Sequence, residues 1–143
     1  MSNGVSALDD GIDPFAEYFT TRLPLSCLVS DNRGFGDSDV KEGMVRQEIS
    51  PAEQTSDISG AVTFVQLRAD VDPDRAGIWG SSFGSGNVLW VGAVDRRVKV
   101  VLSQVPLVDG WKNYHWLLKP DLTKERNKAF QEGLSRFFAS FLF

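Results

Sequence analysis

The stretch RAGIWGSSFGSG, residues 75–86, contains the pattern G-x-S-x-G between two segments of different character. Residues 75–79 form a short, mostly apolar run that predicts a buried strand, and residues 87–94 predict a helix. The pattern therefore occupies the connection from a strand to a helix. Such a sharp turn needs glycine at positions 80 and 84, because a Cβ there would collide with the neighbouring strand or helix. The stretch predicts an α/β fold.

Ser82 lies at the apex of this turn, where a serine hydroxyl can act as a nucleophile. The following helix begins there, so its dipole and the outward-pointing N–H of Phe83 predict one donor of an oxyanion hole. The alternative is a small-residue turn or a phosphate-binding loop of an unrelated α/β domain. A P-loop would require a lysine after its last glycine, and a dinucleotide-binding loop would require G-x-G-x-x-G near the first strand. Neither is present, so the pattern favours Ser82 as a catalytic residue.

Strands and helices are predicted to alternate on both sides of this turn. The order strand, helix, strand, helix, strand predicts βαβ units and a short parallel sheet of about three strands flanked by helices. From Pro106 onward the apolar residues are largely aromatic and recur at helical spacing. We therefore expect a single domain over 1–143, with a core over 1–105 and a lid-like helical segment over 106–143. Strands are expected at 25–30, 75–79 and 98–103, and helices at 14–23, capped by Asp13, at 56–69 and at 87–94.

The composition is typical of one globular domain and argues against several kinds of partner. The chain has 143 residues, of which 42% are hydrophobic and 24% charged, and a net charge of −4, which disfavours nucleic acid binding. One cysteine and one histidine cannot form a disulfide or a Cys/His zinc site, so we expect no metal and no cofactor. No apolar run approaches the roughly 18 residues of a membrane helix. We expect no membrane partner and a cytoplasmic location.

A second motif, DNRGFGDS at residues 31–38, directly follows the first predicted strand. It resembles the D-x-R-G-x-G-x-S turn of α/β-hydrolases, and the two motifs stand in the order and spacing of that superfamily. Within the superfamily the chain is most similar to dienelactone-hydrolase-like esterases, including polyketide transferases and thiohydrolases. The resemblance implies a partial α/β-hydrolase fold, truncated at both ends. The segments that carry this similarity are VDPDR (71–75), GIWGSS (77–82) and DRRVKVV (95–101).

The same resemblance implies roles for further residues. The stretch NGVSA, residues 3–7, is similar to the family's H-G-x-S-A loop, which implies that the N–H of Val5 is the second oxyanion-hole donor. In the family, the acid and the histidine of the triad follow the serine along the chain. Asp109 and His115 occur in that order, so a Ser82/Asp109/His115 triad is one hypothesis. The other hypothesis is that Asp109 caps a lid helix that contains His115.

Several other polar and aromatic residues are expected to serve the structure. Asp31 and Arg33 are expected to fix the turn in which they lie. Cys27 is expected to be a buried strand residue that does not act as a nucleophile. Trp79 and Trp90 are expected in the core.

Three functions are open at this point. The first is a serine hydrolase or acyltransferase that acts on a small-molecule or carrier-bound acyl ester or thioester. The second is a catalytically inactive fragment that keeps the turn around Ser82 but lacks the acid and base of a triad. A flavodoxin-like binding domain fits the alternation of elements less well, because no phosphate loop follows the first strand. A three-stranded slab would expose both sheet edges, which predicts low stability or self-association.

Overall fold

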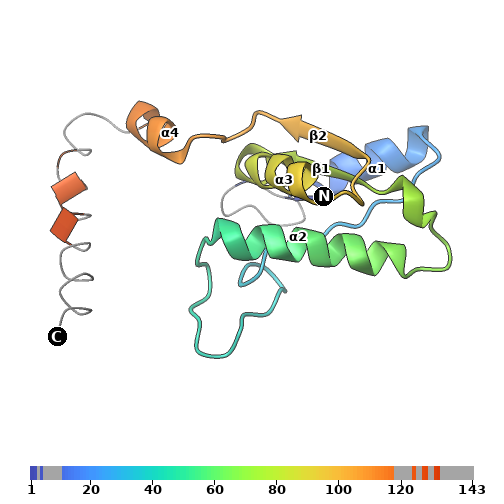
Figure 1. Cartoon of the computed structure of the whole chain (residues 1–143), viewed down its shortest axis with the longest axis horizontal. Helices are drawn as coiled ribbons and strands as arrows, with labels where there is room; N and C mark the ends of the chain where they lie inside the picture. Colours follow the sequence, from blue (N-terminus) through green and yellow to red (C-terminus); the bar gives the residue numbers. More distant parts are fainter. Residues whose placement is uncertain (3, 5–10, 118–123, 125–126, 129–130, 133–143) are drawn as a thin grey trace. The chain divides into compact units, whose positions relative to one another are not determined.

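The computed structural model describes residues 1–2, 4, 11–117, 124, 127–128 and 131–132. The chain divides into two compact units, Met1–Val108 and Asp109–Phe143. Figure 1 shows the described elements along the chain. No helix in this described part is long and apolar enough to cross a membrane.

The centre of the first unit is a βαβ unit. Strand β1 (Gly77–Ser81) leads into helix α3 (Ser82–Val94), which returns to strand β2 (Val100–Gln104). The strands are parallel, with a register from Gly77↔Val100 to Ser81↔Gln104. This confirms the predicted alternation around G-x-S-x-G, although both strands begin two residues later than expected. Arg75 belongs to the short 3₁₀ helix η2 (Pro73–Arg75) instead of the strand.

Two further helices belong to this unit. Helix α1 (Asp13–Arg22) has Pro14 in its first turn, but its N-cap position is Ile12, with no side-chain cap. The prediction that Asp13 caps the helix is therefore wrong, and its charge lies inside the first turn instead, where the helix dipole favours it. Helix α2 (Pro51–Gln66) begins at a proline, and the Ser50 hydroxyl accepts a hydrogen bond from the Glu53 N–H at 3.4 Å. The helix predicted over 56–69 therefore begins five residues earlier than expected.

The segment of residues 25–30 differs from its prediction as a strand. It is extended but forms no strand, and the sheet of the described residues has two strands, β1 and β2. A strand exists only when its backbone pairs with a neighbour. Here a cavity of about 940 Å³ lies between this segment and β1. Cys27, expected to be buried in a strand, is consequently half-buried.

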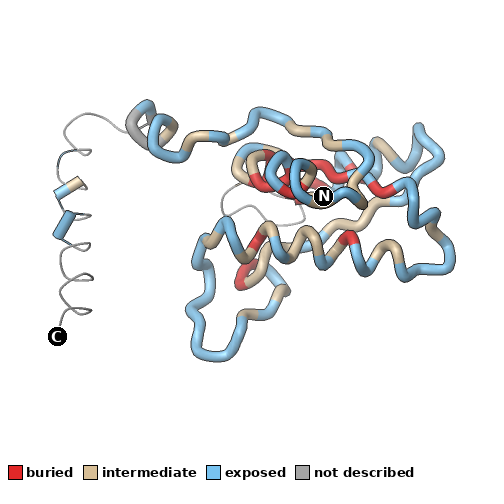
Figure 2. Tube along the Cα trace, viewed as in Figure 1, coloured by how far each residue is buried: buried red, intermediate tan, exposed pale blue. Residues whose placement is uncertain are grey.

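The core of the first unit lies between α2, β1 and α3. It is formed by Val62, Ala76, Ile78, Val88 and Val91, and the buried stretches follow β1 and α3 in Figure 2. Val91 is fully buried, whereas its neighbour Trp90 is 62% exposed, so the expectation that Trp90 belongs to the core is wrong. Consecutive helical residues point about 100° apart, so only one of the two can face the sheet. Trp79 is buried as expected, and its ring stacks on Phe15 with centroids 5.3 Å apart.

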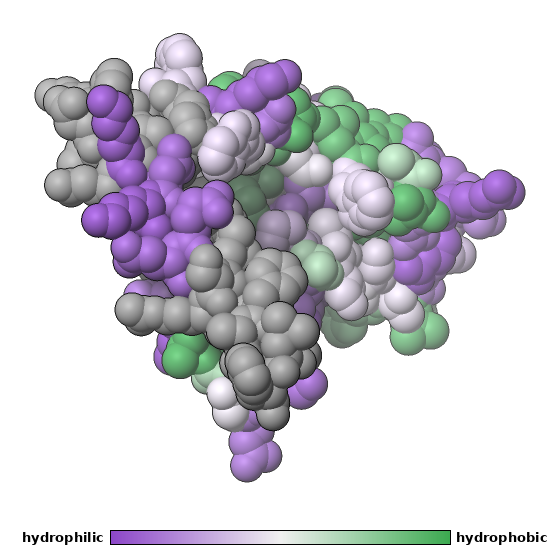
Figure 3. All heavy atoms as spheres, turned by 60° about the vertical axis from the view of Figure 1, so that its left-hand side comes forward, coloured by the Kyte–Doolittle hydropathy of each residue, from purple (hydrophilic) through white to green (hydrophobic). Residues whose placement is uncertain are grey.

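Large apolar side chains lie on the surface of α3 and β2. Figure 3 shows hydrophobic residues gathered on one face of the molecule beside hydrophilic ones. An exposed group of apolar residues of this kind is typical of a surface that another element or molecule covers. The sequence-based prediction of self-association rests on exposed sheet edges and stays a prediction. On α3 the exposed apolar residues are Leu89, Trp90 and Val94, and on β2 they are Val100 and Leu102, which line the cavity beside the segment of residues 25–30.

The DNRGFGDS loop is held by its own charged residues. The Asp31 carboxylate accepts a hydrogen bond from the Asp37 N–H at 3.1 Å, and the Ser38 hydroxyl donates to the Asp31 carbonyl at 2.8 Å. A Cβ on Gly36 would lie 1.9 Å from Asp31 Oδ2 and would displace that carboxylate, and the φ angle of +48° also favours glycine at this position. Arg33 forms two hydrogen bonds to Asp57 and an ion pair of 3.1 Å with Glu53, both on α2. These contacts confirm the structural roles expected for Asp31 and Arg33.

An ionic cluster joins the end of α3 to α2. The Arg97 guanidinium donates two hydrogen bonds to the Asp95 carboxylate, at 2.9 and 2.6 Å, and reaches Thr63 and the Ser59 carbonyl of α2. The Asp95 side chain is only 10% exposed. Hydrogen bonds from Arg97 lower the pKa of Asp95 to about 2.

This cluster predicts how stability changes in acid. The folded-state pKa of Asp95 is lower than the value of about 3.9 in an unfolded chain, so its stabilisation is present above that value. It is lost as the pH falls from about 4 towards 2. We expect the urea midpoint of the wild type to fall across this window and that of Asp95→Asn to fall less. The exposed Asp74→Asn variant is the control, and equal slopes for Asp95→Asn and the wild type would contradict this assignment.

Candidate active site

Ser82 occupies the junction of β1 and α3 as the sequence predicts. It is the first residue of α3, it is exposed, and its φ angle is +54°. A positive φ is uncommon for a residue other than glycine and is strained, and such residues cluster at functional sites. The Ser82 carbonyl accepts a hydrogen bond from the Leu107 N–H at 3.1 Å, which ties the turn to the chain beyond β2.

The turn around Ser82 is possible because two glycines approach each other closely. A Cβ on Gly80 would lie 2.5 Å from the Gly84 carbonyl oxygen and 2.9 Å from the Ser85 nitrogen. Both are backbone atoms, so neither can move aside without distorting α3. The expected steric role of Gly80 is therefore confirmed, and the close approach holds Ser82 above the end of β1.

The N-terminus of α3 contains Phe83, whose N–H the sequence analysis names as an expected oxyanion-hole donor. Phe83 is half-buried and is the second residue of α3. The first four N–H groups of a helix have no partner inside the helix, and they carry the positive end of its dipole. The Phe83 N–H therefore belongs to a set of donors that can stabilise an anion beside Ser82.

The N-terminal residues of the chain lie against this turn. The Ser2 N–H donates to the Trp79 carbonyl at 2.9 Å, and the Ser81 N–H donates to the Ser2 carbonyl at 3.2 Å. A Cβ on Gly4 would lie 3.3 Å from the Ser82 Cβ. The structure therefore places Gly4, the residue before Val5, beside Ser82, while Val5 itself lies outside the described residues. Pairing of Ser2 was missed because a single strand residue leaves no periodic signal in the sequence.

Buried polar contacts hold the first turns of α3. The Ser85 and Ser103 hydroxyls are 2.7 Å apart and link α3 to β2. The Asn87 amide donates to Gln54 Oε1 at 3.0 Å and links α3 to α2. Buried polar groups that satisfy each other in this way select one packing arrangement. They fix the orientation of the helix that begins at Ser82.

Asp109 and His115 belong to the second compact unit, Asp109–Phe143. Asp109 precedes helix α4 (Gly110–Leu117), and its carboxylate accepts a hydrogen bond from the Lys112 N–H at 2.9 Å. The main cause that lowers the pKa of Asp109 is this hydrogen bond. The same bond is the helix cap that the sequence analysis gave as one of two hypotheses for Asp109. His115 lies in α4, and its side chain is outside the described part. The triad therefore stays a hypothesis.

Metal-dependent chemistry has no ligand set in the described part of the chain. No group of three or more His, Cys, Asp or Glu side chains there could hold a metal ion. The largest effect on the Cys27 thiol is burial, which raises its pKa. A higher pKa leaves less of the reactive thiolate. Ser82 remains the nucleophile candidate with a supporting geometry.

Comparisons with known proteins give one consistent result. Residues 31–135 match the model of the prolyl oligopeptidase family. The chain is 33% identical over 109 residues to the thiohydrolase aneE of Aspergillus aculeatus, covering 76% of this chain and 33% of that protein. It is 41% identical over 99 residues to the quorum-quenching protein AidA of Acinetobacter baumannii, and this match covers 69% of this chain and 31% of AidA.

A solved structure shows the same similarity. The crystal structure of the α/β hydrolase GrgF from Penicillium sp. sh18 matches with a TM-score of 0.70 and 28% identity. The match covers 93% of this chain and 45% of GrgF. The chain thus spans about a third of the length of the curated relatives and under half of the structural one.

Proposed function

Because the chain belongs to the prolyl oligopeptidase family, with a partial α/β-hydrolase fold, we propose that Ser82 is the nucleophile of an acyl-transfer reaction. The observation that carries the proposal is the positive φ of Ser82 at the strand-to-helix turn, with Gly80 against Gly84. The similarity to thiohydrolases and polyketide transferases supports an acyl ester or thioester as the substrate class.

The proposed reaction has two steps. The Ser82 Oγ attacks the acyl carbonyl, its proton passes to a general base, and the carbonyl oxygen becomes an oxyanion. The N–H groups of Phe83 and Val5 stabilise that oxyanion. Collapse of the intermediate breaks the bond to the alcohol or thiol, which takes the proton back from the base as it leaves, and an acyl-serine remains. Water or an acceptor alcohol then attacks the acyl-serine, which releases an acid or a new ester and restores Ser82.

A fluorophosphonate probe tests this proposal, because it reacts with an activated serine and not with an ordinary one. We expect the wild-type chain to take up about one probe per molecule and Ser82→Ala to take up none. Ser81→Ala is the matched control, since Ser81 is the adjacent serine and its hydroxyl makes no cap bond to α3.

Two results would refute the proposal. Equal labelling of the wild type and Ser82→Ala would place the reactive group elsewhere. No labelling of a folded wild-type chain would favour the inactive alternative, in which the turn persists without a base.

A further inference from the structure

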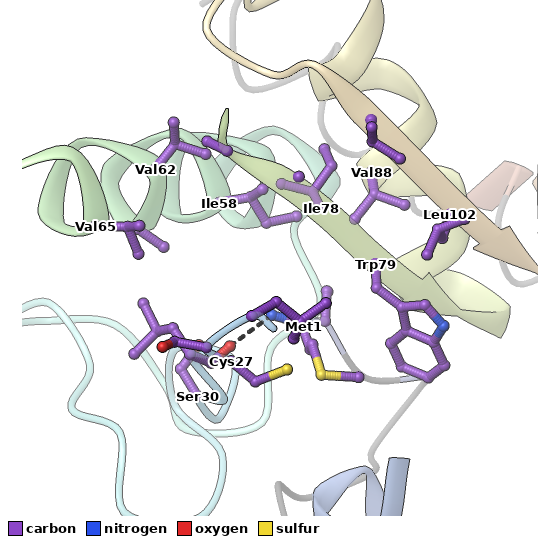
Figure 4. Close-up of a pocket in the computed structure, with 18 of the residues that line it drawn as sticks. Met1, Cys27, Ser30, Ile58, Val62, Val65, Ile78, Trp79, Val88 and Leu102 are labelled. Atoms are coloured by element: carbon purple, nitrogen blue, oxygen red, sulfur yellow. Dashed lines mark hydrogen bonds between the residues drawn. The ribbon is translucent and has the colours of Figure 1, made fainter. Parts of the chain in front are cut away.

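Beyond the end of β2, the chain returns to the turn that presents Ser82. The Leu107 N–H donates a hydrogen bond to the Ser82 carbonyl at 3.1 Å, and Leu107 is half-buried. The strands β1 and β2 end at the same level, since Ser81 is in register with Gln104. Residues 105–107 therefore cross directly from the end of β2 to the first turn of α3. The cavity that Figure 4 shows is a different region, because Ser82 and Leu107 are not among the described residues that line it.

The backbone of this crossing segment is strained. Val105 has a φ angle of +50°, which a β-branched residue rarely adopts, and it precedes Pro106, where an extended backbone with negative φ is the rule. Its side chain is 78% exposed, so burial of that side chain does not offset the strain. In the described part of the chain, three non-glycine residues have a positive φ, and two of them, Ser82 and Val105, belong to this contact. Strained residues persist where the surrounding structure holds them, and they cluster at functional sites.

The crossing segment and α3 fit closely at Gly86. A Cβ added there would collide with the Leu107 carbonyl oxygen and lie 3.3 Å from its carbonyl carbon. Both are backbone atoms, so a side chain at position 86 would push Leu107 away from α3. The N–H of Leu107 is thus held by Ser82, and its carbonyl has room only because residue 86 is glycine.

The carbonyl that accepts this hydrogen bond belongs to the same peptide as the Phe83 N–H. A peptide is planar and trans, so the direction of its C=O fixes the direction of its N–H. A hydrogen bond to the carbonyl also polarises the N–H and strengthens it as a donor. The Phe83 N–H is a proposed donor of the oxyanion hole. The Leu107 N–H consequently acts on that donor without contacting a substrate itself.

We propose that Leu107 is a positioning residue, a role that rests on the proposed function of Ser82. Its N–H, held in place by the strained backbone at Val105, orients and polarises the Phe83 N–H that binds the oxyanion. A misplacement of about 1 Å in an active site can lower a rate about 100-fold, and loss of a whole oxyanion donor costs about as much or more. Loss of the Leu107 hydrogen bond leaves the Phe83 donor present but less well directed, so we expect a reaction about tenfold slower.

Two glycine variants on α3 test this role by a matched comparison. Gly86→Ala would displace Leu107, whereas Gly92→Ala would press on the Val101 side chain of β2, further along the helix. Both changes create a steric clash of α3 with a neighbouring part of the chain, so both should lower the urea midpoint. We expect only Gly86→Ala to lower the maximal rate constant of fluorophosphonate labelling, with an unchanged half-saturating concentration of the probe. Such a split indicates a lost interaction that forms only in the transition state.

A backbone ester removes the hydrogen bond without adding bulk. The exchange Leu107→leucic acid replaces the N–H by an oxygen and keeps the side chain. The control is Val108→2-hydroxyisovaleric acid, since none of the backbone hydrogen bonds between described residues involves the Val108 N–H. We expect the ester at 107, and not the ester at 108, to slow labelling about tenfold and to shift the amide resonance of Phe83 in the NMR spectrum. This resonance is measured whether or not the chain is active, and the ester variants replace Gly86→Ala should that variant fail to fold.

The outcomes distinguish this role from the proposed function. A labelled wild type with unchanged rates for Gly86→Ala and for the Leu107 ester would overturn the role of Leu107 and leave Ser82 as the nucleophile. Equal slowing by Gly86→Ala and Gly92→Ala, or by the two esters, would show that the contact serves stability alone. A folded wild type that takes up no probe would refute the proposed function and the catalytic part of this role. The Phe83 resonance would then still decide whether Leu107 sets that peptide, and an unchanged resonance would refute this as well.

Discussion

Replacing Gly80 with alanine is expected to lower the free energy of unfolding by about 3 kcal/mol or more. The new Cβ would lie 2.5 Å from the Gly84 carbonyl oxygen, 2.7 Å from its carbon and 2.9 Å from the Ser85 nitrogen. All three belong to the first turn of α3, so β1 and α3 would have to separate. For a chain of this size the melting temperature should fall by about 10 °C.

A second glycine provides the control for Gly80→Ala. Gly60 lies inside α2, is exposed, and has no heavy atom within 4 Å of an added Cβ. Gly60→Ala should therefore raise the free energy of unfolding by up to about 1 kcal/mol, the difference in helix propensity. Urea unfolding of both variants measures the contrast. Gly80→Ala with wild-type stability would mean that the close approach of β1 and α3 is absent in solution.

Truncation of Val91 to alanine has the second largest expected effect on stability. Val91 is fully buried in the core formed with Val62, Ile78 and Val88. The change removes two methyl groups from this core and leaves a cavity, which should cost about 2–3 kcal/mol. Urea unfolding at neutral pH, followed by circular dichroism, measures the loss.

The neighbouring residue is the matched control for Val91. Trp90 has a larger side chain but is 62% exposed on the other side of α3. Trp90→Ala should change the free energy of unfolding by less than about 1 kcal/mol. A greater loss for Trp90→Ala than for Val91→Ala would mean that the outer face of α3 is covered in solution, and that result would support self-association.

The local elements were predictable because their signals lie within a few residues of one another. The steric demand at Gly80 and Gly84 follows from the pattern G-x-S-x-G, since the contact joins residues four apart. The turn at Asp31 and the cap at Asp109 depend on hydrogen bonds that span a few residues. The ends of the helices were predicted less exactly. Asp and Ser are both typical N-cap residues, but of Asp13 and Ser50 only Ser50 forms the cap hydrogen bond.

Long-range features were not predictable in the same way. The apolar residues of α3 occur on all sides of the helix, so hydrophobicity alone could not show that Trp90 points away from the sheet and Val91 towards it. The alternative roles of Asp109 illustrate the same difficulty. The capping hydrogen bond supports a structural role for Asp109. A catalytic role would require Asp109 to lie near Ser82, and Asp109 belongs to a separate compact unit.

The sequence by itself determined the βαβ unit, the turn that presents Ser82, and the loop fixed by Asp31 and Arg33. Short-range sterics and hydrogen bonds specify these features. Only the tertiary structure decided the state of the segment of residues 25–30, which has the composition of a strand but forms none. Strand formation requires a neighbouring backbone in a ladder, and among the described residues the hydrogen bond from the Met1 amino group to the Leu28 carbonyl is not part of one. Composition describes what a segment can form, whereas pairing depends on what lies next to it.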